Sequence, residues 1–186
     1  MGKLSALLLI IVIFLSASSM DKNTSTNNGQ NELNLFTVAG CCPSQGATYE
    51  YRGPESQLIA LINSERQAID IPPIAVNWEV SRLARYKSEE MKTHQMFTHE
   101  SLLYGDPAEL LTRFNVPFAK IGANIAMGQE TPQEVLESWL SSPGHMANIV
   151  NPSFTSAGVG YSCDDNGISF WTLILVAKPT PGPTAH

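Results

Sequence analysis

The chain has 186 residues, with 11 Lys and Arg against 17 Asp and Glu, so its formal net charge is −6. This length favours a single domain, and the hydrophobic content of 43% is sufficient for a packed core. The acidic balance, without any basic run, argues against nucleic acid as a partner. An acidic chain also gains no attraction from the anionic headgroups of a membrane.

Residues 1–19 have the pattern of a signal peptide. Lys3 precedes an apolar-to-small run from Leu4 to Leu15, and small residues follow it. As a helix this run would span about 18 Å, whereas a bilayer core is about 30 Å thick. We therefore expect export and cleavage, with an uncleaved anchor as the alternative, and no transmembrane span in the mature chain.

Residues 20–52 are predicted to form a flexible N-terminal tether, because their polar first part cannot bury enough apolar surface to offset the entropy of ordering. Export permits disulfides, so one of the neighbours Cys41 and Cys42 could pair with Cys163; the alternative is that all three stay reduced. The segment ending at Cys41 also resembles a lipoprotein cleavage box. It lies far beyond the apolar run, so lipidation there is not the favoured interpretation.

Four helices are expected in the folded part. The first spans 54–68, with a proline at its first position, and the second begins at the N-cap Asn77. The third and fourth begin at capping boxes led by Asp106 and Thr131. The Ser142-Pro143-Gly144 segment is expected to end the fourth helix.

Three strands are expected, over 121–127, 158–163 and 169–176, and a turn at 164–167 joins the last two. The last strand is almost continuously apolar, which indicates that both of its faces are covered. The predicted fold is an α/β protein, an α-β-α sandwich with a small, mostly antiparallel sheet between helices. This domain should span 53–178, and 179–186 should form a disordered tail.

Six segments resemble, in order, the motifs of the CAP superfamily (cysteine-rich secretory proteins, antigen five and pathogenesis-related proteins), also called the SCP domain, in its bacterial-type branch. They lie between residues 58 and 176, a stretch that makes up most of the mature chain. They are Leu61–Arg66, Trp78 with Leu83-Ala84, Phe97–Ser101, Ile121–Ala126, Trp139–Asn148 and Gly158–Tyr161. The resemblance implies the α-β-α sandwich and a cleft at one end of it.

In the family this cleft holds two histidines and two acidic residues, and some members bind a divalent cation there. His99 and His145 match the histidines. Ala123 stands where the first glutamate is expected, and Ser142 stands near the second acid. Because a catalytic zinc takes three protein ligands, two imidazoles alone would hold a cation such as zinc only weakly.

Accessory roles at the cleft are assigned to Glu100, Asn124 and Ser142; of these, Glu100 could swing toward the adjacent His99. Either histidine could instead only donate a hydrogen bond to a backbone carbonyl and fill the cleft wall. Other residues are assigned to the surface or the core: His94 to the surface, and Trp139, Met91, Met96 and Met127 to the core, with the methionines filling gaps rather than binding metal.

The residues described above are compatible with three functions. The favoured hypothesis is a secreted or cell-surface, non-catalytic binding module for a small ligand, a lipid or a protein. The alternatives are a metal-dependent hydrolase that uses His99 and His145, and a structural envelope protein whose function resides in the tether or the tail. The sequence lacks a Gly-x-Ser-x-Gly elbow, a His-Glu-x-x-His helix and a phosphate-binding glycine loop.

Overall fold

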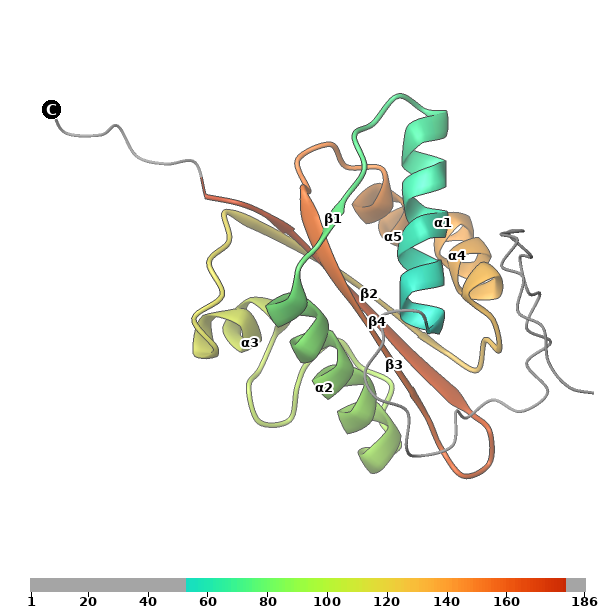
Figure 1. The fold of residues 1–186 in the computed structure, drawn as a ribbon. Coiled ribbons are helices and arrows are strands. Elements are labelled where there is room, and N and C mark those ends of the chain that lie inside the picture. The colour runs from blue at the N-terminus through green and yellow to red at the C-terminus, as the bar shows by residue number, and fades with distance from the viewer. Residues whose placement is uncertain (1–52, 180–186) are drawn as a thin grey trace, which may run out of the picture. The chain divides into compact units, whose positions relative to one another are not determined.

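The structure, a computed structural model, describes residues 53–179 (Figure 1). The predicted signal peptide and tether, with Cys41 and Cys42, and residues 180–186 of the tail lie outside the described residues. The disulfide pairing and the domain boundaries therefore stay predictions. Within the described range, no helix combines the length and the apolar character needed to cross a bilayer.

The expected helix starts are confirmed. The side chain of Asn77 accepts from the backbone N–H groups of Glu79 and Val80, while Asp106 and Thr131 each complete a capping box. The helices are α1 (Pro54–Ala68), α2 (Trp78–His94), α3 (Pro107–Arg113), α4 (Pro132–Ser141) and α5 (Pro143–Ile149).

Helix α5 was not predicted. Ser142-Pro143-Gly144 does end α4, but Pro143 also takes the first position of a new helix. Proline suits this position because its missing N–H has no partner in the first turn and its fixed φ is already helical. The break in the chain is therefore a junction between two helices, and it places His145 in the first turn of α5.

The strands agree with the predicted ones to within two residues, and a short strand is added. They are β1 (Ala75–Val76), β2 (Lys120–Met127), β3 (Ser156–Cys163) and β4 (Ser169–Ala177). Their order across the sheet is β1-β3-β4-β2; β1 pairs with β3 in parallel, and the other pairs are antiparallel. The predicted turn is confirmed by a hydrogen bond of 3.0 Å from Gly167 N to the Asp164 carbonyl.

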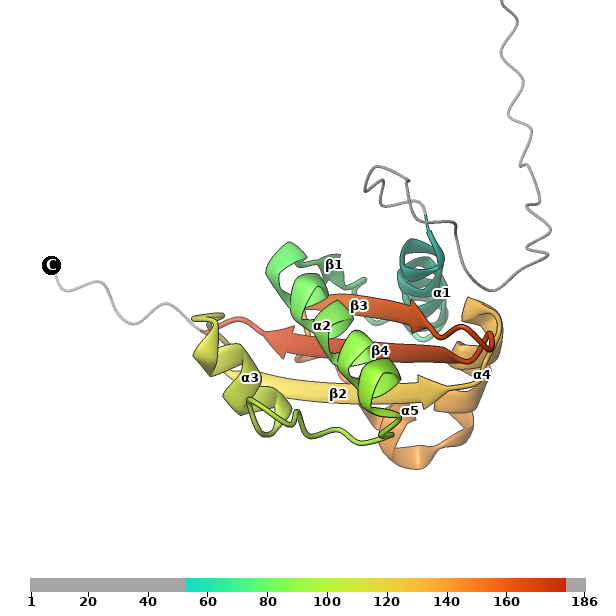
Figure 2. The same cartoon turned by 90° about the horizontal axis from the view of Figure 1, so that it is seen from below.

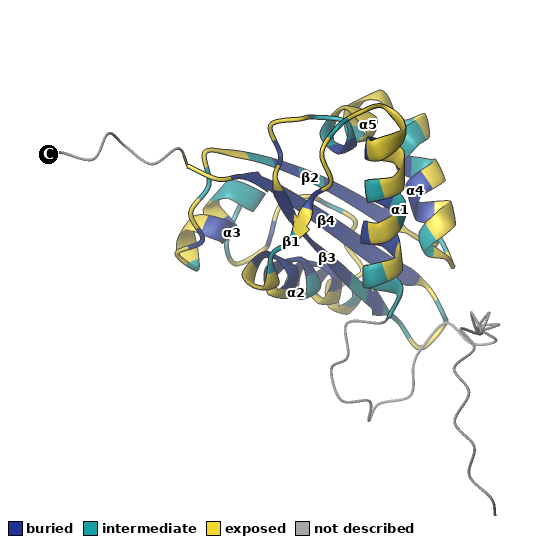
Figure 3. Ribbon diagram, turned by 45° about the horizontal axis from the view of Figure 1, so that its top comes forward, coloured by how far each residue is buried: buried dark blue, intermediate teal, exposed yellow. Residues whose placement is uncertain are grey.

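The sheet lies between two helical layers, as expected for an α-β-α sandwich. Helices α2 and α3 cover one face, and α1, α4 and α5 lie on the other (Figures 1 and 2). Every residue of the central strand β4 is buried, which Figure 3 shows as a continuous dark ribbon. Trp139 of α4 is fully buried, and its indole N–H donates to the Ile125 carbonyl at 3.0 Å.

Helix α2 and strand β3 approach too closely for side chains to lie between them. A Cβ added to Gly158 would lie 2.1 Å from the Ser81 nitrogen, and one on Gly160 would lie 2.2 Å from the Ala84 carbonyl carbon. Ordinary van der Waals contact for such an atom is 3.4–4 Å. These two glycines therefore fix how deeply α2 sits on the sheet.

A buried arginine joins α1 to the chain after α5. Arg66 is 1% exposed, and its guanidinium donates to four backbone carbonyls, those of Pro72, Ile149, Asn151 and Phe154. Charge-assisted hydrogen bonds of this kind compensate for the desolvation of the group. Burial lowers the pKa of Arg66.

Candidate functional site

The structure brings together the two histidines that the family resemblance singles out. His99 lies in the connection between α2 and α3, and His145 lies on α5, 46 positions later by their numbers. Their ring centroids are 6.2 Å apart, and the rings are tilted by 49°. We call His99 and His145 the histidine pair. His94 lies outside the pair and is exposed, as predicted; His99 is exposed as well, and His145 is partly buried.

His145 is held in place by contacts of α5 with β2, which is the edge strand of the sheet. The buried amide of Asn124 donates to the His145 carbonyl at 3.1 Å and accepts from Asn148 Nδ2 at 2.8 Å. Asn148 Nδ2 also lies 3.3 Å from the Ala123 carbonyl. The amides of these two asparagines therefore satisfy polar groups at the sheet edge and fix α5 there.

Successive side chains of β2 point to opposite faces of the sheet, and this alternation determines the face on which Ala123 lies. Ile121 and Ile125 pack with the residues of α2, whereas Asn124 bonds to α5. Ala123 lies on the same face of β2 as Ile121 and Ile125. A longer side chain at this position would therefore extend into the α2 layer. The connection that carries His99 begins at the end of α2. The methyl group that is present supplies no metal ligand and no general base.

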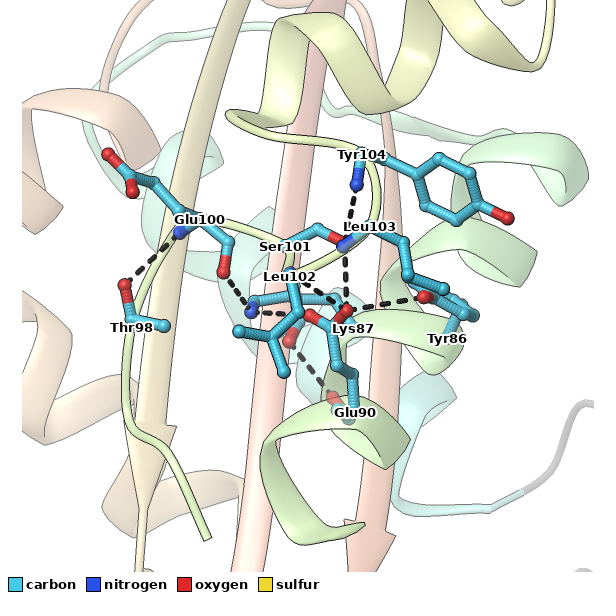
Figure 4. Close-up of polar contacts among 11 residues, drawn as sticks. Tyr86, Lys87, Glu90, Thr98, Glu100, Ser101, Leu102, Leu103 and Tyr104 are labelled. Carbon is cyan, nitrogen blue, oxygen red and sulfur yellow. Dashed lines mark hydrogen bonds and ion pairs between the residues drawn. The ribbon is translucent and has the colours of Figure 1, made fainter. Parts of the chain in front are cut away.

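A buried ion pair of α2, which was not predicted from the sequence, bonds to the residues that follow His99. Lys87 and Glu90 of α2 are 4% and 5% exposed at their side chains, and Lys87 Nζ lies 2.9 Å from Glu90 Oε2. Lys87 Nζ also donates to the Glu100 carbonyl at 2.6 Å. Glu90 Oε1 accepts from Ser101 Oγ at 2.8 Å and from Leu102 N at 3.0 Å (Figure 4).

The electrostatic surroundings favour the neutral form of both histidines. Burial lowers the pKa of His99, and the nearby positive charges of His145 and Lys87 lower it further. Burial also lowers the pKa of His145. His99 is exposed to solvent, so these interactions are screened there. At neutral pH each ring therefore presents one N–H donor and one ring-nitrogen acceptor.

The donor set around the histidine pair does not fit a catalytic zinc site. Within the described part of the chain, no three His, Cys, Asp or Glu side chains group closely enough to hold a metal ion. The Glu100 side chain extends away from Lys87 in Figure 4, and the contribution of Glu100 to this region is its backbone carbonyl. Ser142 is the junction between α4 and α5 and makes no side-chain cap bond to α5. Metal binding by His99 and His145 stays a prediction, and it would use these two side chains as its ligands.

Two methionines assigned to the core are in fact at the surface. Met91 is buried, as predicted, but Met96 is 44% exposed and Met127 is 45% exposed. Met96 follows the left-handed Gln95 that caps α2, and Met127 is the last residue of β2, so both lie where an element ends. Met96 and the half-exposed Phe97 lie in the same connection as His99, and Met146, which is 41% exposed, follows His145 directly. Exposed apolar side chains therefore accompany both histidines.

The histidines do not line either of two open hollows on the described surface. One lies at α3 and includes Leu103, Glu109 and Arg113; the other lies at the start of α2 and includes Trp78, Arg82 and Tyr161. The cleft that the resemblance implies around the histidine pair therefore stays a prediction.

Comparison with known proteins matches residues 59–175 to the family model of CAP, the cysteine-rich secretory protein family. The YkwD protein of Bacillus subtilis (strain 168) is 35% identical over 161 residues, which are 87% of this chain and 59% of YkwD. An extracellular SCP-domain protein of Bacillus anthracis has a solved structure with a TM-score of 0.62 at 32% identity, over 68% of this chain and 41% of that one. The chain thus spans about half the length of these relatives.

An outer surface protein of Borrelia burgdorferi has the same fold at low identity. Its TM-score is 0.65 at 16% identity, over 72% of this chain and 99% of that protein. This likeness supports the fold alone. The family model, in contrast, covers more than half of the chain and includes both histidines. The protein is therefore a member of the CAP family, the cysteine-rich secretory protein family, and its similar relatives YkwD and the SCP-domain protein are bacterial.

Proposed function

We propose that this protein is a secreted or cell-surface, non-catalytic binding module whose ligand contacts the surface around the histidine pair. The observation that carries the proposal is the 6.2 Å approach of two imidazole rings that come from separate elements and that, among residues 53–179, have no carboxylate grouped with them. The extracellular description of the similar Bacillus anthracis protein supports a location outside the cell.

The chemistry of the pair suits recognition better than hydrolysis. Two neutral imidazoles offer donors and acceptors to a polar group, and the exposed Met96, Phe97 and Met146 offer apolar contact beside them. Hydrolysis would need an activated water, a nucleophile or a general base. With Ala123 at the position of the expected glutamate, neither a third metal ligand nor that base is supplied.

A ligand screen tests the proposal. Lipid vesicles, soluble cell-wall fragments and divalent cations are each added to the protein, and the midpoint of thermal unfolding is measured. A specific ligand present at a hundredfold excess over its Kd should stabilise the fold by roughly 2.7 kcal/mol. The shift should disappear in His99→Ala and His145→Ala, and it should persist in His94→Ala, whose side chain is exposed and lies outside the pair.

Three results would contradict the proposal. If none of these ligand classes moves the unfolding midpoint, the pair is a structural feature of the surface. If the protein cleaves a peptide or cell-wall substrate and His145→Ala does not, the site is catalytic after all. A ligand shift that survives both histidine substitutions would place the binding surface elsewhere on the domain.

A further inference from the structure

The Lys87–Glu90 pair is an unusual choice for the buried side of α2. The two side chains are almost fully removed from water, three positions apart on a helix whose other buried residues are mostly apolar or small. Removing two charges from water carries a large desolvation cost, and apolar residues of the same volume often give equal or greater stability. A role beyond stability is therefore needed to explain the pair.

The hydrogen bonds of the pair point to that role, because those that leave α2 end on the segment just after His99. Lys87 Nζ donates to the Glu100 carbonyl, and Glu90 accepts from the hydroxyl of Ser101 and the backbone N–H of Leu102. Three consecutive residues are thus tied to one helix (Figure 4). The backbone immediately before them carries the His99 ring.

The anchored segment is also closed on itself. Ser101 N donates to the Gly105 carbonyl at 2.6 Å, and Gly105 N donates back to the Ser101 carbonyl at 3.1 Å. Asp106, the next residue, caps α3. The connection is therefore fixed to α2 at residues 100–102 and to α3 at its end, whereas His99 lies just outside this fixed part.

The contacts of Glu90 stabilise the charged form of its carboxyl group. Burial acts to raise the pKa of Glu90, but hydrogen bonds from Lys87 and Ser101, the Lys87 charge and the Leu102 N–H outweigh burial, and the pKa is lowered. The carboxylate is thus ionised at neutral pH and accepts from several donors at once. An uncharged side chain at this position would accept fewer and weaker hydrogen bonds.

We propose that Lys87 and Glu90 are positioning residues of the histidine pair: they fix the connection after α2 so that His99 stays within ring contact of His145, which β2 holds independently. This inference rests on the proposed function for its biological meaning, but the hydrogen bonds that support it involve no ligand. In this account the pair contributes little net stability relative to an apolar replacement, and it determines where the His99 ring lies.

The test compares stability with ring proximity in protein produced from the full chain. Ring proximity is followed, without any ligand, by the nuclear Overhauser cross-peak between the His99 and His145 ring protons in histidine-labelled protein. Stability is followed by the urea midpoint. The variants are Lys87→Met, Glu90→Leu and the double substitution. The matched control is Glu79→Leu with Arg82→Met, an ion pair with the same spacing on the same helix that is more than half exposed.

Each single variant should lower the urea midpoint, because it leaves one buried charge without its partner. The double variant should return the midpoint to the wild-type value and yet lose the ring cross-peak. The control should keep both. A double variant that keeps the cross-peak, or that stays as unstable as the single variants, would overturn the proposal, as would single variants that keep the wild-type cross-peak and midpoint.

The two proposals can fail separately. If the cross-peak depends on Lys87 and Glu90 but no ligand class shifts the unfolding midpoint, the positioning role holds and the binding function is wrong. If a ligand shift is lost in His145→Ala but is retained in the Lys87→Met and Glu90→Leu double variant, the binding function holds and the positioning role is wrong.

Discussion

Replacing Gly158 by alanine should destabilise the protein strongly, because the added methyl group would meet the backbone of α2. The new Cβ would lie 2.1 Å from the Ser81 nitrogen, 2.4 Å from the Val80 carbonyl carbon and 2.5 Å from the Ser81 Cα. The shortest of these falls more than 1 Å inside the ordinary contact distance of 3.4–4 Å, and backbone atoms cannot rotate away as a side chain can. Helix α2 must therefore move off β3.

Overpacking of a well-packed core typically costs about 1–3 kcal/mol. Because three backbone atoms are in the way, we expect Gly158→Ala to reach the upper end, about 3 kcal/mol, as measured by urea unfolding at constant m-value. Gly144→Ala is the matched control: a Cβ there meets nothing within 4 Å, and alanine favours the α5 helix. Its stability should equal or exceed that of wild type. An unchanged urea midpoint in Gly158→Ala would refute the close packing of α2 on β3.

Two further predictions concern buried and titrating groups. Arg66→Met should cost at least about 3 kcal/mol in urea unfolding, since four carbonyls lose their charged donor, whereas Met at the exposed Arg113 should have little effect. The pKa values of His99 and His145 are lowered in the folded protein. Between these folded values and the ordinary histidine pKa of about 6.5, the unfolded chain therefore binds more protons than the folded protein does. The free energy of unfolding should therefore fall as the pH drops through 6.5 toward the folded pKa values, and rise as the pH increases through this window. The His99→Ala and His145→Ala double variant should lose this slope; a slope that stays unchanged would mean that other groups cause it.

The helix starts and the strands could be predicted because their signals are local. Asn77, Asp106 and Thr131 cap their helices through their own side chains, within three residues. The burial of β4 followed in the same way from its apolar run. These features need no knowledge of the rest of the chain, so composition and spacing were sufficient to predict them.

Helix α5 was missed because proline followed by glycine is a strong signal for the end of a helix, and the same proline also suits the start of one. The role of Asn124 could be placed only near the cleft, since its partners are 21 and 24 positions away in the chain. Such long-range hydrogen bonds leave no periodic signal.

The sequence does carry a signal for the Lys87–Glu90 pair. Lys87 lies three positions after Ala84 and four before Met91, so helical spacing places it on the buried stripe of α2. A lysine on such a stripe, with a glutamate three positions later, indicates a buried ion pair. Its contacts with residues 100–102 could not be predicted, because the connection between α2 and α3 has no regular structure of its own.

The central claim is that the histidine pair lacks the third protein ligand of a catalytic zinc site, and a calorimetric zinc titration tests it most directly. Wild type, His99→Ala and Ala123→Glu are compared in protein produced from the full chain. We expect wild type to bind zinc weakly at most and Ala123→Glu to bind it more tightly, because the new carboxylate extends from β2 into the α2 layer and adds a third ligand. Tight zinc binding by wild type that His99→Ala abolishes would contradict the claim.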